Sequence, residues 1–208
     1  MPLYKSITPN SQTHVKIWKI TESYHDLFHS IELTPKNLDR VLGMKSELHQ
    51  RGFLSVRHLL GQFGYSDEDL FYDENGKPHL KDGKHISITH SFIFSAVIIS
   101  DHVVGIDIEK QRNKITIIAH KFVNYEFEYL VKEALDYIKE LTVIWCVKES
   151  LYKLFATPGL SFREHCLVIP FSISDESTLA WIIYEEGKYR YNINFLEFEG
   201  FTCAYALS

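Results

Sequence analysis

Residues 103–110, with the sequence VVGIDIEK, combine two carboxylates with a strand-like pattern. Side chains alternate between the two faces of a strand, so Gly105, Asp107 and Glu109 share one face and apolar side chains occupy the other. The Cα atoms of Asp107 and Glu109 then lie about 7 Å apart, so both carboxylates can converge on one point. Such a face is either solvated or holds a cation, and the glycine leaves room for a ligand or another backbone segment.

A second segment with chemical potential is WCVKESLYKLF, residues 145–155. Its apolar residues recur at steps of three and four, which predicts a helix with one buried stripe: Ile144, Val147, Leu151 and Leu154. Glu149 and Lys153 are four residues apart on a neighbouring face, and such a pair taken alone is most simply a surface ion pair. If Glu149 instead faces the two strand carboxylates, the three acids supply the oxygen ligands that Mg²⁺ prefers. Lys153 would then neutralise charge on a phosphate in the same place.

The composition predicts an ordinary globular protein. The chain has 208 residues, of which 45% are hydrophobic and 14% aromatic, enough for a sizeable core. A net charge of -5 argues against a nucleic-acid-binding domain, which usually carries a basic excess. Three cysteines, Cys146, Cys166 and Cys203, stand among apolar residues and suit free thiols in a reducing compartment. No segment resembles a signal peptide or a membrane span, so we expect a cytoplasmic protein without membrane contact.

The hydrophobic pattern predicts the order of the remaining elements. We expect a strand at residues 14–20, one or two helices over 34–62, and loop over 71–85. Three strands should follow at 85–90, 94–100 and 103–109, then helices at 115–139 and 141–155. The chain should end in four strands, at 165–173, 178–184, 188–198 and 201–207.

This order predicts an α+β fold of two similar αβ halves, 1–109 and 110–208, each a small antiparallel sheet packed with helices. No low-complexity linker separates the halves, so we expect them to pack as one unit. If the strands of 85–109 form an antiparallel meander, His90 and Glu109 lie at one edge of a sheet. They would be separated by two strand spacings, about 10 Å, which suits a phosphorylated ligand.

Four segments, in this order and spacing, resemble the 4'-phosphopantetheinyl transferase superfamily: NGKPHL, HISITHS, VVGIDIEK and WCVKESLYK. The family signature is a G-I/V-D core followed by W/F-x-x-K-E-x-x-x-K, and 42 residues separate Asp107 from Glu149 here. The likeness covers residues 34–160. The length and the two αβ halves resemble the monomeric, surfactin-synthetase-activating type, which implies a pseudo-twofold monomer.

The resemblance implies transfer of the 4'-phosphopantetheine arm of coenzyme A to a serine of an apo acyl or peptidyl carrier protein. Adenosine 3',5'-bisphosphate would be released. Asp107, Glu109 and Glu149 match the magnesium ligands of the family. Glu149 also matches the general base, although Glu109 or a bound water could share that task. Lys153 matches the lysine on the diphosphate.

Further residues match positions that bind coenzyme A in the family. Lys77 and His90 match contacts to its nucleotide end and phosphates, and Thr89 retains the hydroxyl of the usual I-S-H-S motif. Arg51 and Arg57 fall where the family places basic side chains near the 3'-phosphate, and a guanidinium suits bidentate phosphate contact. A structural ion pair is an equally good account of both arginines.

The segment KQRNKITIIAHKF, residues 110–122, places basic residues near apolar ones. Lys110, Arg112, Lys114 and Lys121 could steer an acidic carrier protein toward the apolar residues Ile115, Ile117 and Phe122. A helix with an ordinary core face explains the apolar residues of this segment equally well. Two other functions stay open for the chain as a whole. One is a metal-dependent phosphohydrolase that uses the same acids, and the other is a catalytically silent relative that only binds carrier proteins.

Overall fold

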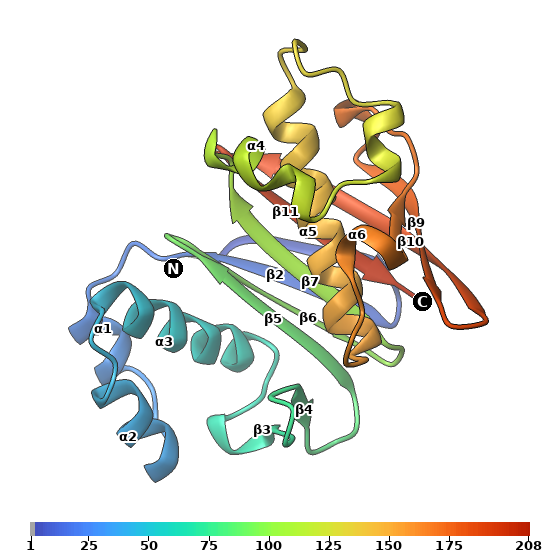
Figure 1. Cartoon of the computed structure of the whole chain (residues 1–208). Helices are drawn as coiled ribbons and strands as arrows, with labels where there is room; N and C mark the ends of the chain where they lie inside the picture. Colours follow the sequence, from blue (N-terminus) through green and yellow to red (C-terminus); the bar gives the residue numbers. More distant parts are fainter. Residues whose placement is uncertain (1–2) are drawn as a thin grey trace. The chain divides into compact units, whose positions relative to one another are not determined.

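The computed structural model describes residues 3–208, whose contacts divide the chain into two compact units, Met1–His102 and Val103–Ser208. Each unit contains an antiparallel sheet and a long helix packed against it (Figure 1). This confirms the predicted α+β class with small antiparallel sheets. Within the described residues, every helix is too short or too polar to cross a membrane.

The sheet of the first unit has the order β1-β2-β6-β5, with every neighbouring pair antiparallel. Its strands are β1 (Leu3–Asn10), β2 (Thr13–Lys19), β5 (His85–Ser91) and β6 (Phe94–Ser100). The predicted strands at 14–20, 85–90 and 94–100 are confirmed. We did not predict β1, because its largely exposed residues form no apolar run. Every residue of β6 is buried, as expected for a central strand that is covered on both faces.

The helices of the first unit are α1 (Tyr24–His29), α2 (Pro35–Leu42) and α3 (Glu47–Gln62). Helices α2 and α3 confirm the helical region predicted over 34–62. Thr34 is the N-cap of α2 and Pro35 its first residue, where a missing N–H costs nothing. The buried face of α3, including Leu54 and Leu59, belongs to the same core cluster as Val97 of the sheet.

The region 71–85, which we predicted as loop, contains part of a short hairpin. Strand β3 (Leu70–Tyr72) pairs with β4 (Pro78–Leu80), and Leu70 lies opposite Leu80. Both leucines are buried in the core of the first unit. The loop prediction was wrong for these residues because burying the two leucines brings the backbones of the turn's two arms together.

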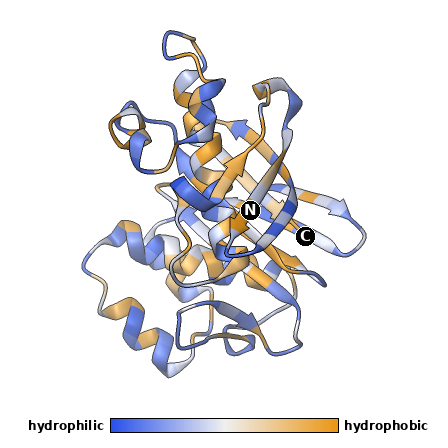
Figure 2. Cartoon of the chain, turned by 45° about the vertical axis from the view of Figure 1, so that its right-hand side comes forward, coloured by the Kyte–Doolittle hydropathy of each residue, from blue (hydrophilic) through white to orange (hydrophobic). Residues whose placement is uncertain are grey.

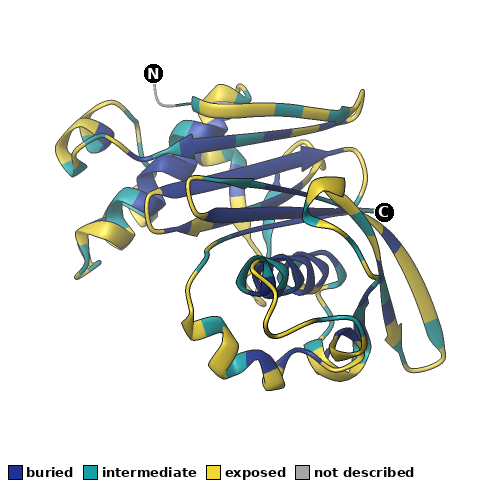
Figure 3. Ribbon diagram, turned by 90° about the horizontal axis from the view of Figure 1, so that it is seen from above, coloured by how far each residue is buried: buried dark blue, intermediate teal, exposed yellow. Residues whose placement is uncertain are grey.

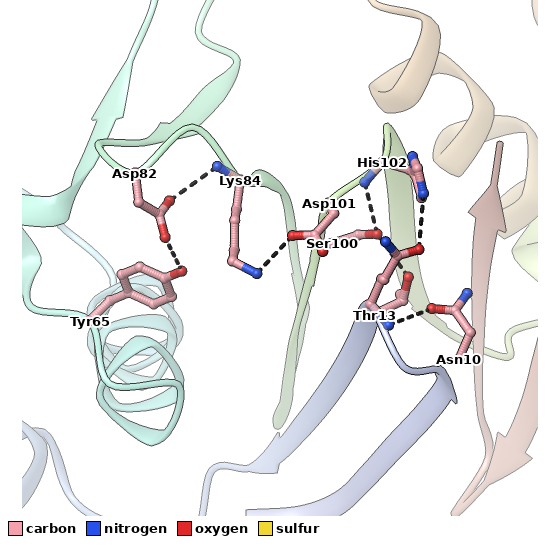
Figure 4. A network of polar contacts seen from close by, with 9 residues as sticks. Asn10, Thr13, Tyr65, Asp82, Lys84, Ser100, Asp101 and His102 are labelled. Carbon is pink, nitrogen blue, oxygen red and sulfur yellow. Dashed lines mark hydrogen bonds and ion pairs between the residues drawn. The ribbon is translucent and has the colours of Figure 1, made fainter.

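Polar side chains connect the hairpin ends at one side of the first unit (Figure 4). Thr13 and Ser100 share a buried hydrogen bond of 2.8 Å between their hydroxyl groups. Nearby, the Lys84 ammonium lies 2.7 Å from Asp101, and the Tyr65 hydroxyl donates to Asp82 at 2.6 Å. The first two contacts join the ends of neighbouring strands, since Thr13–Ser100 connects β2 with β6 and Lys84–Asp101 connects β5 with β6.

The sheet of the second unit has the order β7-β11-β10-β9-β8 and is antiparallel throughout. Its strands are β7 (Val104–Lys110), β8 (Cys166–Val168), β9 (Ser177–Tyr184), β10 (Gly187–Phe198) and β11 (Phe201–Leu207). All five predicted strands of this region are present, although β8 is much shorter than the predicted 165–173.

Strand β7 does not continue the β5–β6 hairpin, so the predicted meander is wrong. It pairs instead with β11, with Asp107 opposite Ala204. The spacing of about 10 Å that we derived for His90 and Glu109 in one sheet therefore no longer applies. The long helix at residues 137–155 packs against one face of β7, while β11 pairs with the edge of the strand. Strand β7, placed in the predicted half 1–109, consequently belongs to the second unit.

Helix α5 (Tyr137–Phe155) is the long helix of the second unit. Its predicted stripe of Ile144, Val147, Leu151 and Leu154 is buried. Figure 3 shows α5 end on, with buried residues around most of its circumference, and Figure 2 shows that α5 and the strands beside it are mainly hydrophobic. The three cysteines are free and buried, as predicted.

The helix predicted over 115–139 is largely absent. The segment contains only α4 (Lys114–Ile118), the 3₁₀ turns Ala119–Lys121 and Tyr125–Glu128, and the start of α5. Two physical reasons account for this. Val123, Asn124 and the aromatic residues that follow are weak helix formers, and Phe122 and Glu126 both turn into the interior, where tertiary contacts outweigh helical periodicity. Helix α6 (Phe162–His165) follows α5.

Candidate active site

The acidic face of β7 lies against helix α5. Ile106 and Ile108 on the opposite face are fully buried. A Cβ atom placed on Gly105 would lie 1.9 Å from the Ser150 carbonyl oxygen, so only glycine permits this approach of the helix backbone. The glycine therefore makes room for another backbone segment, which is one of the two roles predicted for it.

Small side chains on α5 maintain this close packing. The Ser150 hydroxyl donates to the Ala204 carbonyl at 3.0 Å and also lies 2.7 Å from the Cys146 carbonyl. The Cys146 thiol lies 3.5 Å from the Thr202 carbonyl on the same strand, β11. Helix α5 thus rests directly on the β7–β11 pair, and residues that flank this line of contact, such as Glu149 and Lys153, lie beside the acidic face of β7.

Lys153 reaches from α5 to Asp107. Its ammonium donates to Asp107 Oδ1 at 2.7 Å and to the Ile106 carbonyl at 2.9 Å. The Lys153 side chain is 28% exposed and the Asp107 side chain 8%. The pair is therefore buried on the carboxylate side and accessible on the ammonium side, which leaves Lys153 able to meet an anionic ligand.

Glu149 shares an electrostatic environment with both strand acids. Burial raises the pKa of Glu149 most, followed by the negative charges of Asp107 and Glu109, and against the opposing charge of Lys153 the pKa rises from 4.5 to about 7. The charges of Asp107 and Glu109 on β7 thus both act on Glu149 of α5. A carboxyl group with a pKa near neutrality is suited to exchange a proton at physiological pH.

The three acids agree in chemical type with a magnesium site. All offer hard oxygen donors, and a divalent cation would relieve the repulsion that raises the Glu149 pKa. Across residues 3–208, no three or more His, Cys, Asp or Glu side chains are arranged as a metal-binding group. Asp107 instead has the Lys153 ammonium beside it. The three carboxylates therefore suit magnesium in chemical type. In the structure, Asp107 is paired with the Lys153 ammonium.

A second ion pair on α5 was not predicted. The Lys148 ammonium lies 2.7 Å from Glu126 Oε1, and both side chains are 0% exposed. One signal was available in the sequence. Lys148 lies four residues after Ile144 and three before Leu151, so it interrupts the buried stripe, and a buried lysine requires an acidic partner.

In the first unit, Arg57 lies in the interior. Its Nε atom is 3.0 Å from Asp67 Oδ1, and its guanidinium lies over the Phe53 ring, 3.5 Å from the centroid. Asp67 also accepts hydrogen bonds from the Thr34 backbone and the Asn37 amide. This geometry indicates that Arg57 forms a structural ion pair rather than a contact to a phosphate.

Arg51 and His90 lie in one neighbourhood of the first unit. A Cβ on Gly52, the residue after Arg51, would lie 3.3 Å from His90 Nδ1, so the His90 ring lies against α3 there. The Arg51 guanidinium donates to the Ile20 carbonyl at 3.2 Å. Thr89 is buried, whereas His90 is exposed.

Lys77 directly precedes β4 and acts on the start of strand β5. Its charge, with that of His102 and His79, adds to burial in lowering the pKa of His85, which begins β5, whereas His90 lies near the end of that strand. The structure therefore separates Lys77 from His90 along one strand. An extended ligand could meet both, but a single phosphate could not.

The first unit also contains a pocket that the sequence did not reveal. It has a volume of about 350 Å³ and lies between α2 and β3, with Lys36, Arg40, Asp67, Phe71, Tyr72 and Gly76 among its lining residues. The Arg40 guanidinium lies 5.7 Å from the centroid of the Tyr72 ring. Aromatic faces and a guanidinium in one pocket suit a base together with a phosphate group.

The predicted docking segment is basic and partly exposed. Lys110, Arg112, Lys114 and Lys121 are exposed, and Ile117 is 70% exposed. Phe122, in contrast, is buried in the core of the second unit. The core-face explanation therefore holds for Phe122, while Ile117 is available to a partner.

Comparison with known proteins finds similarity over the segments that carry these residues. The model of the 4'-phosphopantetheinyl transferase superfamily matches residues 103–206, which include β7 and α5. One relative is the 4'-phosphopantetheinyl transferase gsp of Aneurinibacillus migulanus, which is 28% identical over 162 residues, or 74% of this chain. That alignment spans 65% of the relative's length. The chain belongs to the 4'-phosphopantetheinyl transferase superfamily.

Proposed function

We propose that this protein transfers the 4'-phosphopantetheine arm of coenzyme A to a serine of an apo acyl or peptidyl carrier protein. The observation that carries the proposal is the grouping of Glu149 with Asp107, Glu109 and Lys153 where α5 meets β7. Family membership supports the same reaction. We further propose that the protein works as a monomer in the cytoplasm.

In this reaction, Glu149 accepts the proton of the carrier serine, a task for which a pKa of about 7 suits it. The serine oxygen forms a bond to the β-phosphorus of coenzyme A. The bond from that phosphorus to the bridging oxygen breaks, and adenosine 3',5'-bisphosphate leaves with the electron pair. Lys153 offsets the charge that develops on the diphosphate, because its ammonium is accessible from solvent.

Magnesium is part of the proposal. Asp107, Glu109 and Glu149 would hold the ion, which when bound supplies positive charge to the diphosphate. The support is chemical: all three side chains offer oxygen donors, and burial, together with the charges of Asp107 and Glu109, raises the pKa of Glu149.

The nucleotide end of coenzyme A is proposed to bind the first unit. The pocket beside Arg40 and Tyr72 has room and chemistry for an adenine with a phosphate. Arg51, His90 and Lys77 supply further positive charge or hydrogen bonds along α3 and β5. For the carrier protein we propose docking on residues 110–121, where Ile117 is 70% exposed among basic side chains.

Mass spectrometry of the carrier protein tests the proposal. The protein is incubated with coenzyme A, Mg²⁺ and an apo carrier protein, and the carrier is then weighed. Addition of one phosphopantetheine group is the expected result. Release of nucleotide with no addition would show a phosphohydrolase, and complex formation with neither would show a silent binding protein. The Glu149→Gln variant is the matched control, because it keeps the shape of the side chain and removes the base.

A further inference from the structure

The buried pair of Lys148 and Glu126 has no part in the reaction described above, although Lys148 directly precedes Glu149. The two charged groups lie 2.7 Å apart, and each side chain is 0% exposed. Lys148 belongs to α5, and Glu126 to the 3₁₀ turn Tyr125–Glu128. The pair therefore joins the helix that carries Glu149 to a separate segment of the same unit.

The hydrogen bonding of this pair is complete. The Lys148 ammonium donates to the Phe122 carbonyl at 2.7 Å and to the Phe162 carbonyl at 3.1 Å, in addition to Glu126. Three acceptors match the three protons of an ammonium group. Glu126 in turn accepts hydrogen bonds from the backbone N–H groups of Val168, at 2.9 Å, and Asn124, at 3.2 Å. One turn of α5 is thereby connected to four points of the surrounding backbone.

Stability alone does not explain why charged residues occupy this place. Burying two charges costs desolvation free energy, and a well-packed apolar pair of the same size is often as stable or more so. Hydrogen bonds and ion pairs are directional, so they fix the rotation and the axial position of the helix. Apolar packing does not fix them in this way. Apolar packing alone, such as that of Val147 in the core cluster that also contains Phe122, would allow a small shift of α5 along its axis.

The other side of α5 shows why position matters. Ser150 lies against Gly105 so closely that a Cβ on the glycine would be 1.9 Å from the Ser150 carbonyl oxygen. Beside this contact, Lys153 donates to Asp107, and the charge of Asp107 acts on Glu149. Since Lys148 and Glu149 are adjacent, any rotation that breaks the buried pair also moves Glu149 relative to β7.

We propose that the Glu126–Lys148 pair is a positioning device for Glu149, setting the rotation and axial position of α5 at the turn that carries the base. This inference rests on the proposed function. Neither Lys148 nor Glu126 touches substrate, and both act through the placement of α5.

The test uses the full-length Glu126→Gln/Lys148→Met double variant. Glutamine keeps an oxygen that can accept from Val168, methionine keeps the length of the lysine stem, and both charges are removed. We expect the variant to fold, kcat to fall about 10- to 100-fold, and the KM values for coenzyme A and carrier to stay within about twofold, because displacement of a catalytic group impairs chemistry more than binding. Reduced kcat with unchanged KM supports the proposal, and an unchanged kcat overturns it.

Val143→Ala serves as the structural control. Val143 is a fully buried residue of α5 outside the polar network, and its truncation lowers stability without removing a directional contact. We expect its kcat to match the wild type. If Val143→Ala loses kcat as much as the double variant, loss of stability accounts for both, and the positioning role is overturned.

Hydrogen exchange separates this inference from the proposed function. We expect amides of residues 145–153 to exchange at least about tenfold faster in the double variant than in Val143→Ala, since local opening free energies differ between segments. Equal exchange in the two variants overturns the positioning role, whatever the activity. A wild-type protein that fails to modify any carrier overturns the proposed function, and exchange then decides whether the pair holds α5.

Discussion

Helix α5 carries two lysines, each 2.7 Å from a carboxylate, in opposite environments. Lys148 and Glu126 are 0% exposed, and backbone groups satisfy their remaining hydrogen bonds. Lys153 is 28% exposed and Asp107 8%, at the junction of α5 and β7. The distance between the charges is the same in both pairs, so distance does not distinguish a structural pair from a reactive one.

Access to solvent makes the difference. A sealed pair cannot exchange a partner, because either charge left alone would be buried without compensation. The Lys153 ammonium is 28% exposed, so it can meet an incoming phosphate while it stays beside Asp107. Two of the three arginines of the first unit repeat the contrast, since Arg57 is buried against Asp67 while Arg40 is exposed beside a pocket.

The largest expected effect comes from breaking the sealed pair. Lys148→Ala leaves Glu126 buried and unpaired, so we expect the free energy of unfolding to fall by about 3–5 kcal/mol. Lys153→Ala should cost less, about 1–3 kcal/mol, and should chiefly lower kcat. Urea denaturation of both variants measures the difference. A greater loss of stability in Lys153→Ala would reverse the assignment of the two pairs.

The next largest effect is expected at the contact between Gly105 and Ser150, beside the Lys153–Asp107 pair. In Gly105→Ala the new Cβ would lie 1.9 Å from the Ser150 carbonyl oxygen, so β7 and α5 must separate. We expect a loss of at least about 1–3 kcal/mol of stability together with reduced turnover. Gly61→Ala in α3 is the control, because nothing lies within 4 Å of its Cβ position. That change should instead stabilise the protein by about 0.4–1 kcal/mol. Equal melting temperatures for the two variants would contradict the close packing described here.

The Glu149→Gln variant should change stability in a way that depends on pH, and it should lose activity. The pKa of Glu149 is raised to about 7 in the folded state, so its contribution to stability is present below 4.5 and is lost as the pH rises through 7. The variant should therefore melt above the wild type at pH 8 in the absence of metal, and close to it at pH 4.5. Turnover should be abolished. Thermal melts across this pH range check the sign, and a variant that is less stable at pH 8 would show that Glu149 is not destabilised by its neighbours.

The smallest expected effect concerns the pocket of the first unit. Arg40→Met removes an exposed guanidinium, so stability should change by less than about 0.5 kcal/mol. The KM for coenzyme A should rise about tenfold, as expected for one lost charge-assisted hydrogen bond. Arg57→Met should show the opposite pattern, with lower stability and little direct effect on binding. Steady-state kinetics and melting curves of both variants complete the comparison, and an unchanged KM in Arg40→Met would remove the pocket from the coenzyme A site.

The sequence by itself determined the elements whose signals are local. Alternation over 103–110 predicted a strand with Asp107 and Glu109 on one face, and apolar spacing over 144–154 predicted a helix with Glu149 and Lys153 one turn apart. These patterns are readable because each depends only on neighbouring residues and on the periods of strand and helix. Four such segments carried the resemblance to the family, which the family model over residues 103–206 confirms.

Tertiary structure alone decided which distant residues meet. The partner of β7 is β11, near the other end of the chain, although β6 is its neighbour in sequence. The predicted helix over 115–139 gave way to turns because Phe122 and Glu126 face the core, and Glu126 there meets Lys148. The residue types of Arg57 and Lys153 likewise did not decide that Arg57 is buried and Lys153 partly exposed. Burial depends on contacts between segments far apart in the chain, and no local pattern of residue types encodes them.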